Sequence, residues 1–162
     1  MGVCLELFNE SEHIKYIQGW EEKKELYSFL SHTRPKYLRN NDEDAKVKTV
    51  FYLIWLSGKY VGATWLEEIT DHDAKLSIYI ADPSCRGQGV GDQAIQVLVG
   101  KAFNELNLNS VYLNVRCGNE RAVKCYKKNG FEIAEEYSNI VFSNGEVGGA
   151  YRMILNRVKE LI

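Results

Sequence analysis

Several features that would mark a special environment are absent from this sequence. It has only two prolines, no repeat or low-complexity segment, and no run of about 18 apolar residues, the length that a membrane-spanning helix requires. The start, MGVCLELFNESEH, lacks the basic region and apolar run of a secretory signal. Lys and Arg are spread along the chain, without the dense basic stripe of a nucleic-acid binder. We therefore expect a cytoplasmic protein that binds neither membrane nor nucleic acid.

Cysteine and histidine are also sparse, and their spacing argues against the common metal sites. The four cysteines include no Cys-x-x-Cys pair, and the three histidines show no ligand spacing with them or with one another. We therefore expect no metal. In a reducing compartment the cysteines are interpreted as free thiols that pack as small hydrophobic residues.

The composition is that of an ordinary globular protein. Of the 162 residues, 45% are hydrophobic and 26% are charged, which disfavours disorder and a fibrous architecture. A chain of this length can bury roughly 68–70% of its unfolded surface around one core. We therefore expect a single domain over residues 1–162.

The beginning of the chain predicts a strand, helices and a loop. Residues 3–8 predict a strand, and apolar residues at helical spacing within 11–32 predict one or two helices, divided near Gly19. The polar segment 34–48 has no periodicity, and we expect a surface loop there.

The next segments predict three consecutive antiparallel strands. Residues 49–56 and 60–69 are rich in β-branched and aromatic residues, and Ser57-Gly58 supplies the turn between them. The polar turn at 70–73 then leads into a third strand at 76–81.

After Pro83 the hydrophobic period changes. Apolar residues at three- and four-residue spacings predict a long amphipathic helix over 91–106, and alternation over 111–115 predicts a half-buried strand. A helix from Asn119 to Asn129 and a hairpin of 131–142 with 147–155 complete the order.

The most informative stretch, residues 78–91, runs from a strand through a glycine-rich turn into a helix. Such a junction points backbone N–H groups at one small volume, and the helix N-terminus adds a partial positive charge that favours a phosphate. A Walker loop is absent. The dinucleotide fingerprint is met by Gly87 and Gly89 but ends in Asp92, and no acidic residue follows near twenty positions on. A tight turn without a ligand is the plain structural alternative.

Two spaced motifs carry a family resemblance. Arg86-x-x-Gly89-x-Gly91 resembles the Gln/Arg-x-x-Gly-x-Gly/Ala signature of the GCN5-related N-acetyltransferases (GNAT), and Asn119-x-x-Ala122-x-x-x-Tyr126-x-x-x-Gly130-Phe131 resembles the family's downstream helix and its exit. The resemblance implies an α+β fold: a mixed, mostly antiparallel sheet of about seven strands, flanked by helices in three α/β/α layers and splayed at the cofactor groove.

The resemblance also implies acetyl-CoA as the acetyl donor and a set of residues that bind it. Backbone amides of the glycine-rich loop would bind the pyrophosphate, while the end of the preceding strand would pair with the pantetheine arm like an added strand. Arg86 would support either the phosphates or the loop geometry. The cofactor-binding residues implied are Ile80, Ala81, Arg86, Gly87, Gln88, Gly89, Val90, Gly91, Asp92 and Asn119.

For catalysis the family analogy makes Tyr126 the general acid, since a phenol with a pKa near 10 stays protonated at neutral pH. A core aromatic role for Tyr126 and an N-cap role for Asn119 are the structural alternatives. Glu67 or Glu68 is the candidate general base, and strand alternation allows only one of them to face the groove. Transfer would be direct, and an acyl-cysteine route through Cys117 or Cys125 is disfavoured.

The acceptor is less defined than the cofactor. We expect a small-molecule or peptide amine, bound between the first sixty residues and the hairpin at 143–149. Four aromatic residues are candidates to line this pocket, with core packing favoured: Trp20, Tyr27, Tyr37 and Trp65. The family resemblance also allows a homodimer. The alternative function is a non-catalytic acyl-CoA sensor or interaction module on the same fold.

Overall fold

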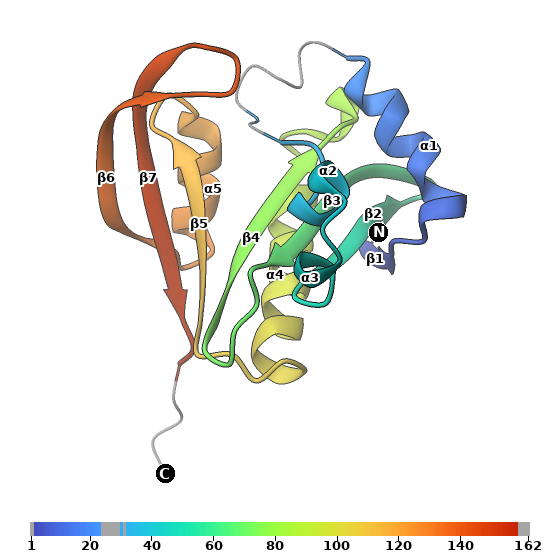
Figure 1. Cartoon of the computed structure of the whole chain (residues 1–162), viewed down its shortest axis with the longest axis horizontal. Helices are drawn as coiled ribbons and strands as arrows, with labels where there is room; N and C mark the ends of the chain where they lie inside the picture. Colours follow the sequence, from blue (N-terminus) through green and yellow to red (C-terminus); the bar gives the residue numbers. More distant parts are fainter. Residues whose placement is uncertain (1, 24–29, 31, 159–162) are drawn as a thin grey trace.

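The computed structural model describes residues 2–23, 30 and 32–158, and one mixed sheet of seven strands organises them (Figure 1). The spatial order is β1-β2-β3-β4-β5-β7-β6, and every neighbouring pair is antiparallel except β4 and β5. The strands are β1 Cys4–Leu7, β2 Val50–Leu56, β3 Lys59–Glu67, β4 Asp73–Ile80, β5 Ser110–Arg116, β6 Glu132–Val141 and β7 Val147–Asn156.

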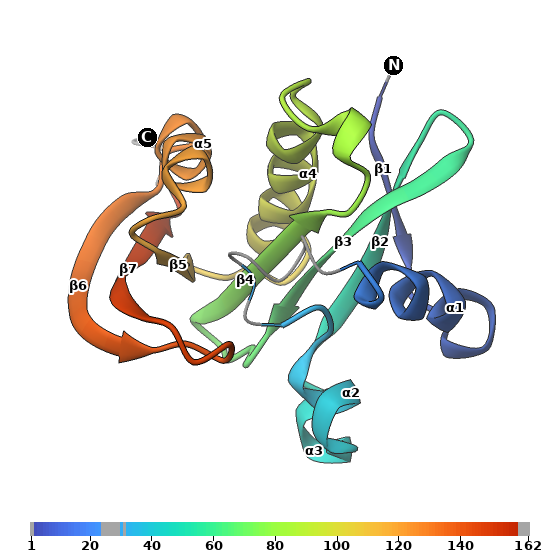
Figure 2. The same ribbon diagram turned by 90° about the horizontal axis from the view of Figure 1, so that it is seen from above.

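Helices cover both faces of this sheet, which gives the three layers expected (Figure 2). One face carries the two long helices of the second half of the chain, and the other carries the N-terminal helices. The helices are α1 Glu10–Glu21, α2 Lys36–Asn40, α3 Glu43–Lys46, α4 Val90–Asn104 and α5 Glu120–Lys128, with a 3-10 turn at Pro83–Cys85. The α+β fold, the mixed sheet and the closing hairpin predicted from sequence are confirmed.

Two helix predictions were wrong in detail. Helix α1 continues through Gly19 to Glu21, because Ile17 and Trp20 on either side of the glycine are both buried against the sheet. The segment 34–48 contains α2 and α3 rather than only a loop. Helix α3 is capped by Asp42, whose side chain accepts from Ala45 N, and helices this short show no hydrophobic period in the sequence. Residues 24–29 and 31 of the predicted second helix lie outside the described residues.

The amphipathic stripe of α4 packs as predicted. Ala94, Leu98 and Ala102 are fully buried, and Leu98 and Ala102 join strand residues such as Leu113 in the main core. Burying a Leu or Ile side chain contributes roughly 1.5–3 kcal/mol to stability. A second core, which includes Trp20 and Trp65, lies on the opposite face under α1.

The two central strands separate after a short pairing, and this opens the sheet. Parallel contacts between β4 and β5 are limited to Asp73–Lys75 with Ser110–Tyr112. Beyond them β4 continues to pair with β3 as far as Ile80 opposite Gly62. A Cβ at Gly62 would collide with the carbonyl oxygen of Tyr79, so the end of β4 lies against β3 in a way that only glycine permits. The splay predicted between β4 and β5 is thus present (Figure 1).

Candidate active site

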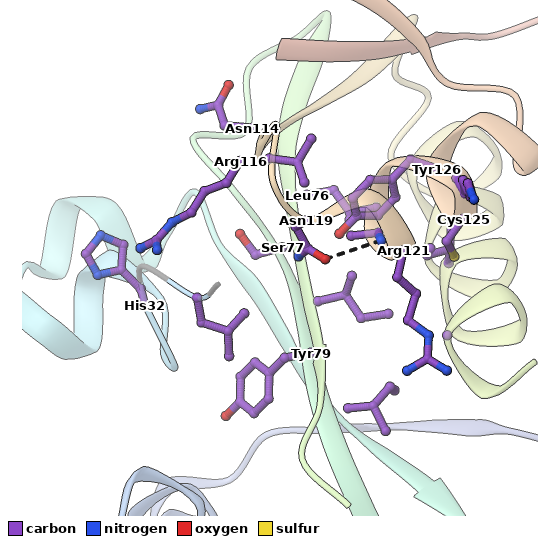
Figure 3. A pocket seen from close by; sticks show the side chains of 18 of the residues that line it. His32, Leu76, Ser77, Tyr79, Asn114, Arg116, Asn119, Arg121, Cys125 and Tyr126 are labelled. Carbon is purple, nitrogen blue, oxygen red and sulfur yellow. Dashed lines mark hydrogen bonds between the residues drawn. The ribbon is translucent and has the colours of Figure 1, made fainter. Parts of the chain in front are cut away.

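A groove with a volume of about 1170 Å³ runs through the opening between β4 and β5. One half, here called the cofactor half, is lined by the loop and helix start at 85–92 and by residues 119–128 around α5. The other, the acceptor half, is lined by the opposite sheet face and by Leu30, His32 and Arg39. Figure 3 shows Asn119, Arg121, Cys125 and Tyr126 on one side of this opening and His32 on the other.

The glycine-rich loop presents an uncapped helix N-terminus to the cofactor half. Gly87 and Gly89 have φ values of 75° and 79°, and Gly89 occupies the N-cap position of α4 without a side-chain hydrogen bond. The first N–H groups of α4 therefore lack the side-chain partner that a Ser or Asp cap would supply. This geometry and the helix dipole suit a phosphate group.

Arg86 has a structural role in this loop. Its guanidinium donates from Nε and Nη2 to the carbonyl oxygen of Ile80, at 3.2 and 3.0 Å. Of the two roles that the sequence left open for Arg86, these contacts support loop geometry. The side chain of Gln88 likewise donates to Ser84 O at 2.8 Å, and Gln88 itself does not line the groove.

The expected backbone pairing at Ala81 requires a correction. Its N–H donates to Val61 O at 2.7 Å, and Ala81 is buried and does not line the groove. The end of β4 lies against β3, so this amide is used within the sheet. Ile80 does line the groove, but its carbonyl already accepts from Arg86.

Asp92 connects the two helices of the cofactor half. Its carboxylate accepts from Lys128 Nζ at 2.9 Å, from Cys125 Sγ at 3.1 Å and from Asn129 Nδ2 at 2.9 Å. The hydrogen bond from Lys128, with those from Cys125 and Asn129, holds the pKa of Asp92 below its usual range. The acidic side chain that breaks the dinucleotide fingerprint thus fixes α4 against α5.

The same contacts explain why Cys125 is a poor nucleophile. Burial, with the hydrogen bond to Asp92 and its charge, raises the pKa of Cys125 to about 12. Since the thiolate is the reactive form, the thiol is inert at neutral pH. An acyl-cysteine route through Cys125 is correspondingly disfavoured.

Asn119 and Tyr126 lie at the junction of the two halves, and each also has the structural role considered as its alternative. Asn119 caps α5, accepting from Ala122 N at 3.4 Å (dashed line in Figure 3). Tyr126 packs edge-on against Phe131 with ring centroids 5.9 Å apart. Both side chains line the groove. Burial, with a smaller contribution from Cys125, raises the pKa of Tyr126, so its hydroxyl stays protonated at neutral pH.

Basic side chains of the α5 segment complete the cofactor half. Arg121, Lys124 and Lys128 line it together with Asp92, whose charge Lys128 offsets. A Cβ at Gly87 would lie 3.0 Å from Arg121 Nη2, so this guanidinium sits directly over the glycine-rich loop. The groove thus combines orphan N–H groups, close backbone access and positive charge, which fits the diphosphate of a CoA thioester.

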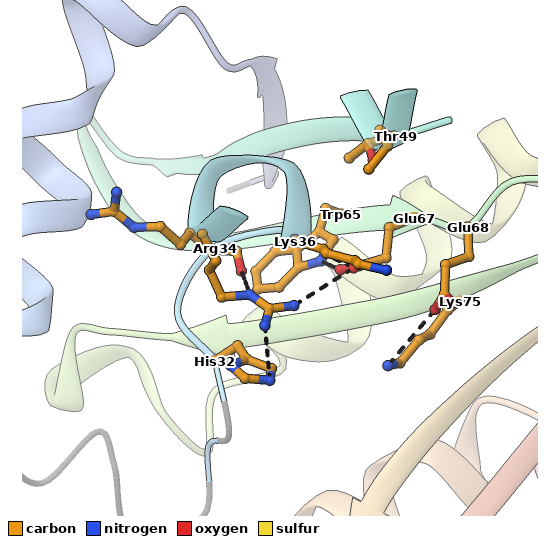
Figure 4. Close-up of polar contacts among 10 residues, drawn as sticks. His32, Arg34, Lys36, Thr49, Trp65, Glu67, Glu68 and Lys75 are labelled. Carbon is orange, nitrogen blue, oxygen red and sulfur yellow. Dashed lines mark hydrogen bonds and ion pairs between the residues drawn. The ribbon is translucent and has the colours of Figure 1, made fainter. Parts of the chain in front are cut away.

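The two candidate bases, Glu67 and Glu68, point in different directions (Figure 4). Glu67 lines the groove, is only 5% exposed, and accepts from Trp65 Nε1 and from Lys36 N. Glu68 has a φ of 54° beyond the end of β3, is exposed, and its Oε2 lies 4.0 Å from Lys75 Nζ. Strand alternation allows one of the two to face the groove, and that residue is Glu67. The turn directs the Glu68 side chain outward, so Glu68 does not line the groove.

His32 and Arg39 are groove residues that the sequence analysis missed. Arg39 Nη1 donates to His32 Nε2 at 3.2 Å, and Nη2 lies 4.0 Å from Glu67 Oε1. Burial, followed by the charges of Arg39 and Lys75, lowers the pKa of His32. No local pattern in the sequence marks this cluster, because it depends on how α2 packs over the sheet.

The predicted aromatic residues divide between core and groove. Trp20 and Trp65 are both buried in the second core, and Trp65 also lines the groove. Tyr37 lies on α2 and does not line it. Tyr27 lies outside the described residues.

Within 2–23, 30 and 32–158, no group of three or more His, Cys, Asp or Glu side chains is arranged to hold a metal ion. Among the same residues no helix is both long and apolar enough to span a membrane.

Comparison with known proteins agrees with this geometry. Residues 11–131 match the acetyltransferase (GNAT) family. A spermidine N(1)-acetyltransferase of Escherichia coli (strain K12) is 28% identical over 152 residues, which are 93% of this chain and 77% of that protein. An aminoglycoside N(6')-acetyltransferase type 1 of Klebsiella pneumoniae is 25% identical over 144 residues, 82% of this chain and 69% of that protein.

Solved structures show the same fold. The spermidine N-acetyltransferase of Vibrio cholerae in complex with CoA and spermine superimposes with a TM-score of 0.80 over 95% of each chain, at 21% identity. A further structure of that enzyme, described as dodecameric, gives a TM-score of 0.76 over 95% of this chain and 93% of that chain, at 20% identity. With the family match over most of its length, the chain belongs to the GNAT family and is an acetyl-CoA-dependent N-acetyltransferase.

Proposed function

We propose that this chain transfers an acetyl group from acetyl-CoA directly to a primary amine of a small acceptor, with Tyr126 as general acid and Glu67 as general base. The observation that carries the proposal is one continuous groove. The uncapped N-terminus of α4, the Tyr126 hydroxyl and the Glu67 carboxylate all belong to it. One groove thus offers acetyl-CoA and the amine acceptor a phosphate-binding end, a proton donor and a proton acceptor.

The cofactor half holds the donor. Acetyl-CoA supplies the acetyl thioester when bound. Amides of the helix start at 88–92 bind its diphosphate, and Arg121 above Gly87 adds a charge-assisted contact. Arg86 keeps the end of β4 and the loop in position through its two bonds to Ile80 O.

Tyr126 supplies the proton that the sulfur leaving group requires. The raised pKa of this phenol keeps the proton on its oxygen until negative charge develops nearby. Asn119, one residue before α5, lines the groove beside it and fixes the start of the helix that carries Tyr126.

Glu67 receives the proton that the acceptor ammonium loses. Its carboxylate is held by Trp65 Nε1 and Lys36 N, and it faces the groove from the last residue of β3. Arg39 Nη2 lies 4.0 Å from Glu67 Oε1 and offsets the charge of this carboxylate.

The relatives indicate small amines as acceptors, since the similar enzymes carry the names spermidine and aminoglycoside acetyltransferase. Two further proposals concern the whole chain. Residues 1–162 form one domain, and the chain self-associates, as the dodecameric description of its structural neighbour suggests. Sedimentation velocity tests the second proposal.

The proposal is tested by measuring thiol release from acetyl-CoA with a panel of primary amines. An active enzyme releases CoA only when an amine is present, and Tyr126→Phe lowers kcat while acetyl-CoA still binds. A chain that binds acetyl-CoA but releases no thiol with any amine would be a sensor, and the catalytic proposal would fail.

A further inference from the structure

The acceptor half of the groove carries an excess of positive charge. Strand alternation places Lys75 of β4, Arg116 of β5 and Arg152 of β7 on the sheet face opposite α4, since their neighbours in sequence pack into the main core. Arg39 of α2 lines the same half. Among the described residues that line it, Glu67 is the one carboxylate against these four cations.

Arg152 is held by neutral partners. Its Nε donates to Asn114 Oδ1 at 3.2 Å, and its guanidinium carbon lies 4.8 Å from the centre of the Tyr112 ring. Its cross-strand neighbour Glu135 accepts from the Tyr137 hydroxyl instead. Within the described part of the chain, no carboxylate oxygen lies within 4.0 Å of a guanidinium nitrogen of Arg152, so its charge is available to a ligand.

Arg116 and Lys75 continue this positive surface. The Arg116 guanidinium stacks over Phe142 at 4.1 Å, and the side chain extends across the groove toward His32 (Figure 3). Its Nη1 is 4.0 Å from Glu146 Oε2, on a glutamate that is mostly exposed to water. Lys75 meets Glu68 only at 4.0 Å, outside the groove.

The carboxylate of Glu67 is already committed to the protein. It accepts from Trp65 Nε1 and Lys36 N, and Arg39 lies beside it. A single acid that is surrounded by three donors cannot also neutralise a ligand with several ammonium groups. Burial lowers the pKa of His32, and the positive charges of Arg39 and Lys75 lower it further.

We propose that the acceptor is a primary amine whose second functional group is an anion, a carboxylate or a phosphate, rather than a polyamine. The inference rests on the proposed function and names the substrate class of its groove. Lys75, Arg116 and Arg152 bind the anion, and the amine is directed toward Glu67 and the cofactor half. A polyamine would bring two or more ammonium groups against these cations, which is unfavourable in a partly desolvated site.

The test compares amines that differ only in the far group, at saturating acetyl-CoA. The four-carbon series is 4-aminobutyrate, 4-amino-1-butanol and 1,4-diaminobutane. The two-carbon series is phosphoethanolamine, ethanolamine and ethylenediamine, and spermidine is added. We expect kcat/KM for the anionic member to exceed that of the diamine by about tenfold or more. Which series shows the larger ratio distinguishes a carboxylate from a phosphate, and the ratio should shrink as KCl is raised.

Two variants locate the effect. Arg152→Gln and Lys75→Gln each keep a polar side chain but remove one charge, and both should lower kcat/KM for the anionic amine about tenfold. The value for the neutral amino alcohol should stay within about twofold, which a general structural defect would not allow. Arg157→Gln is the matched control, because Arg157 bonds to Asn107 and does not line the groove.

The outcomes separate this inference from the proposed function. Preference for the diamine or spermidine would overturn the inference while confirming acetyl transfer. If acetyl-CoA binds but no amine reacts, calorimetric titration in the presence of CoA decides: selective binding of the anionic amines supports the inference, and diamine binding or none overturns it. Absence of acetyl-CoA binding would remove the proposed function itself.

Discussion

The two halves of the groove are built in different ways. The cofactor half comes from two short stretches, 85–92 and 119–128, and depends on backbone N–H groups and two glycines with positive φ. The acceptor half depends on side chains from α2, β3, β4, β5 and β7, which only the register of the sheet brings together. A backbone site constrains sequence strongly, whereas a side-chain site can change its charge without altering the fold. The same cofactor half can therefore be combined with acceptor halves that bind different amines.

The largest effect is expected where the halves meet. Tyr126→Phe removes the proton donor but keeps the ring that packs on Phe131, so kcat should fall about 100-fold. The Kd for acetyl-CoA should change less than about threefold, since the backbone cradle is intact. Steady-state kinetics and calorimetry give both values. Tyr52→Phe, on β2 outside the groove, is the control. An equal fall in kcat in the two variants would show that Tyr126 is not the general acid.

A change confined to the cofactor half should act on donor binding alone. Gly89→Ala forces a Cβ into the left-handed region, at a cost of about 1–2 kcal/mol. We expect the Kd for acetyl-CoA to rise about tenfold, with the acceptor preference unchanged. Gly91→Ala is the matched control for Gly89→Ala. Gly91 lies within α4, and a Cβ at this position would meet nothing within 4 Å beyond its chain neighbours and the local helix backbone. This variant should bind acetyl-CoA normally. A similar loss of acetyl-CoA affinity in both variants would contradict diphosphate binding by the glycine-rich loop.

A change confined to the acceptor half should leave donor binding intact. Glu67→Gln keeps the oxygen that accepts from Trp65 but removes the base, and kcat/KM for the amine should fall about tenfold. The loss is smaller than for Tyr126→Phe because bulk water and buffer can still take the proton. Glu68→Gln, one residue along the chain, should retain activity. Equal behaviour of the two variants would show that the groove-facing carboxylate is not the base.

The smallest effect is expected at Cys125. With its pKa near 12, roughly one thiol in 10⁴ is ionised at pH 8, so iodoacetamide should alkylate Cys125 far more slowly than the exposed Cys4. Alkylation becomes faster as pH rises toward 12, because the thiolate is the reactive form. Cys125→Ser should keep kcat within about threefold. Mass spectrometry follows the alkylation, and an acetylated Cys125 peptide trapped during turnover would contradict direct transfer.

The sequence predicted the strand-loop-helix junction of the cofactor half because its information is local. Gly87, Gly89 and the helical period after Val90 define a strand-loop-helix junction within one continuous stretch. Alternation likewise predicted β5 and the buried faces of the hairpins. The use of the Ala81 amide within the sheet has no local signal in the sequence, because its bond to Val61 depends on how closely β4 approaches β3 at Gly62.

The acceptor half could not be predicted in the same way. Arg39 and His32 lie in a segment without periodicity, and their contact with Glu67 arises from the packing of α2 on the sheet. Arg152 reaches Asn114 only through the pairing of β7 with β5. Residues so far apart in the chain leave no local pattern, so the charge of the acceptor half became visible only in the folded chain.

The central claim is that the groove binds acetyl-CoA through its glycine-rich end, and thermal unfolding tests it most directly. A ligand at about 100 times its Kd adds roughly 2.7 kcal/mol to the free energy of unfolding. Acetyl-CoA should raise Tm clearly, NAD and ATP should leave it unchanged, and the rise with acetyl-CoA should be smaller in Gly89→Ala. No shift with acetyl-CoA, or an equal shift with NAD or ATP, would contradict it.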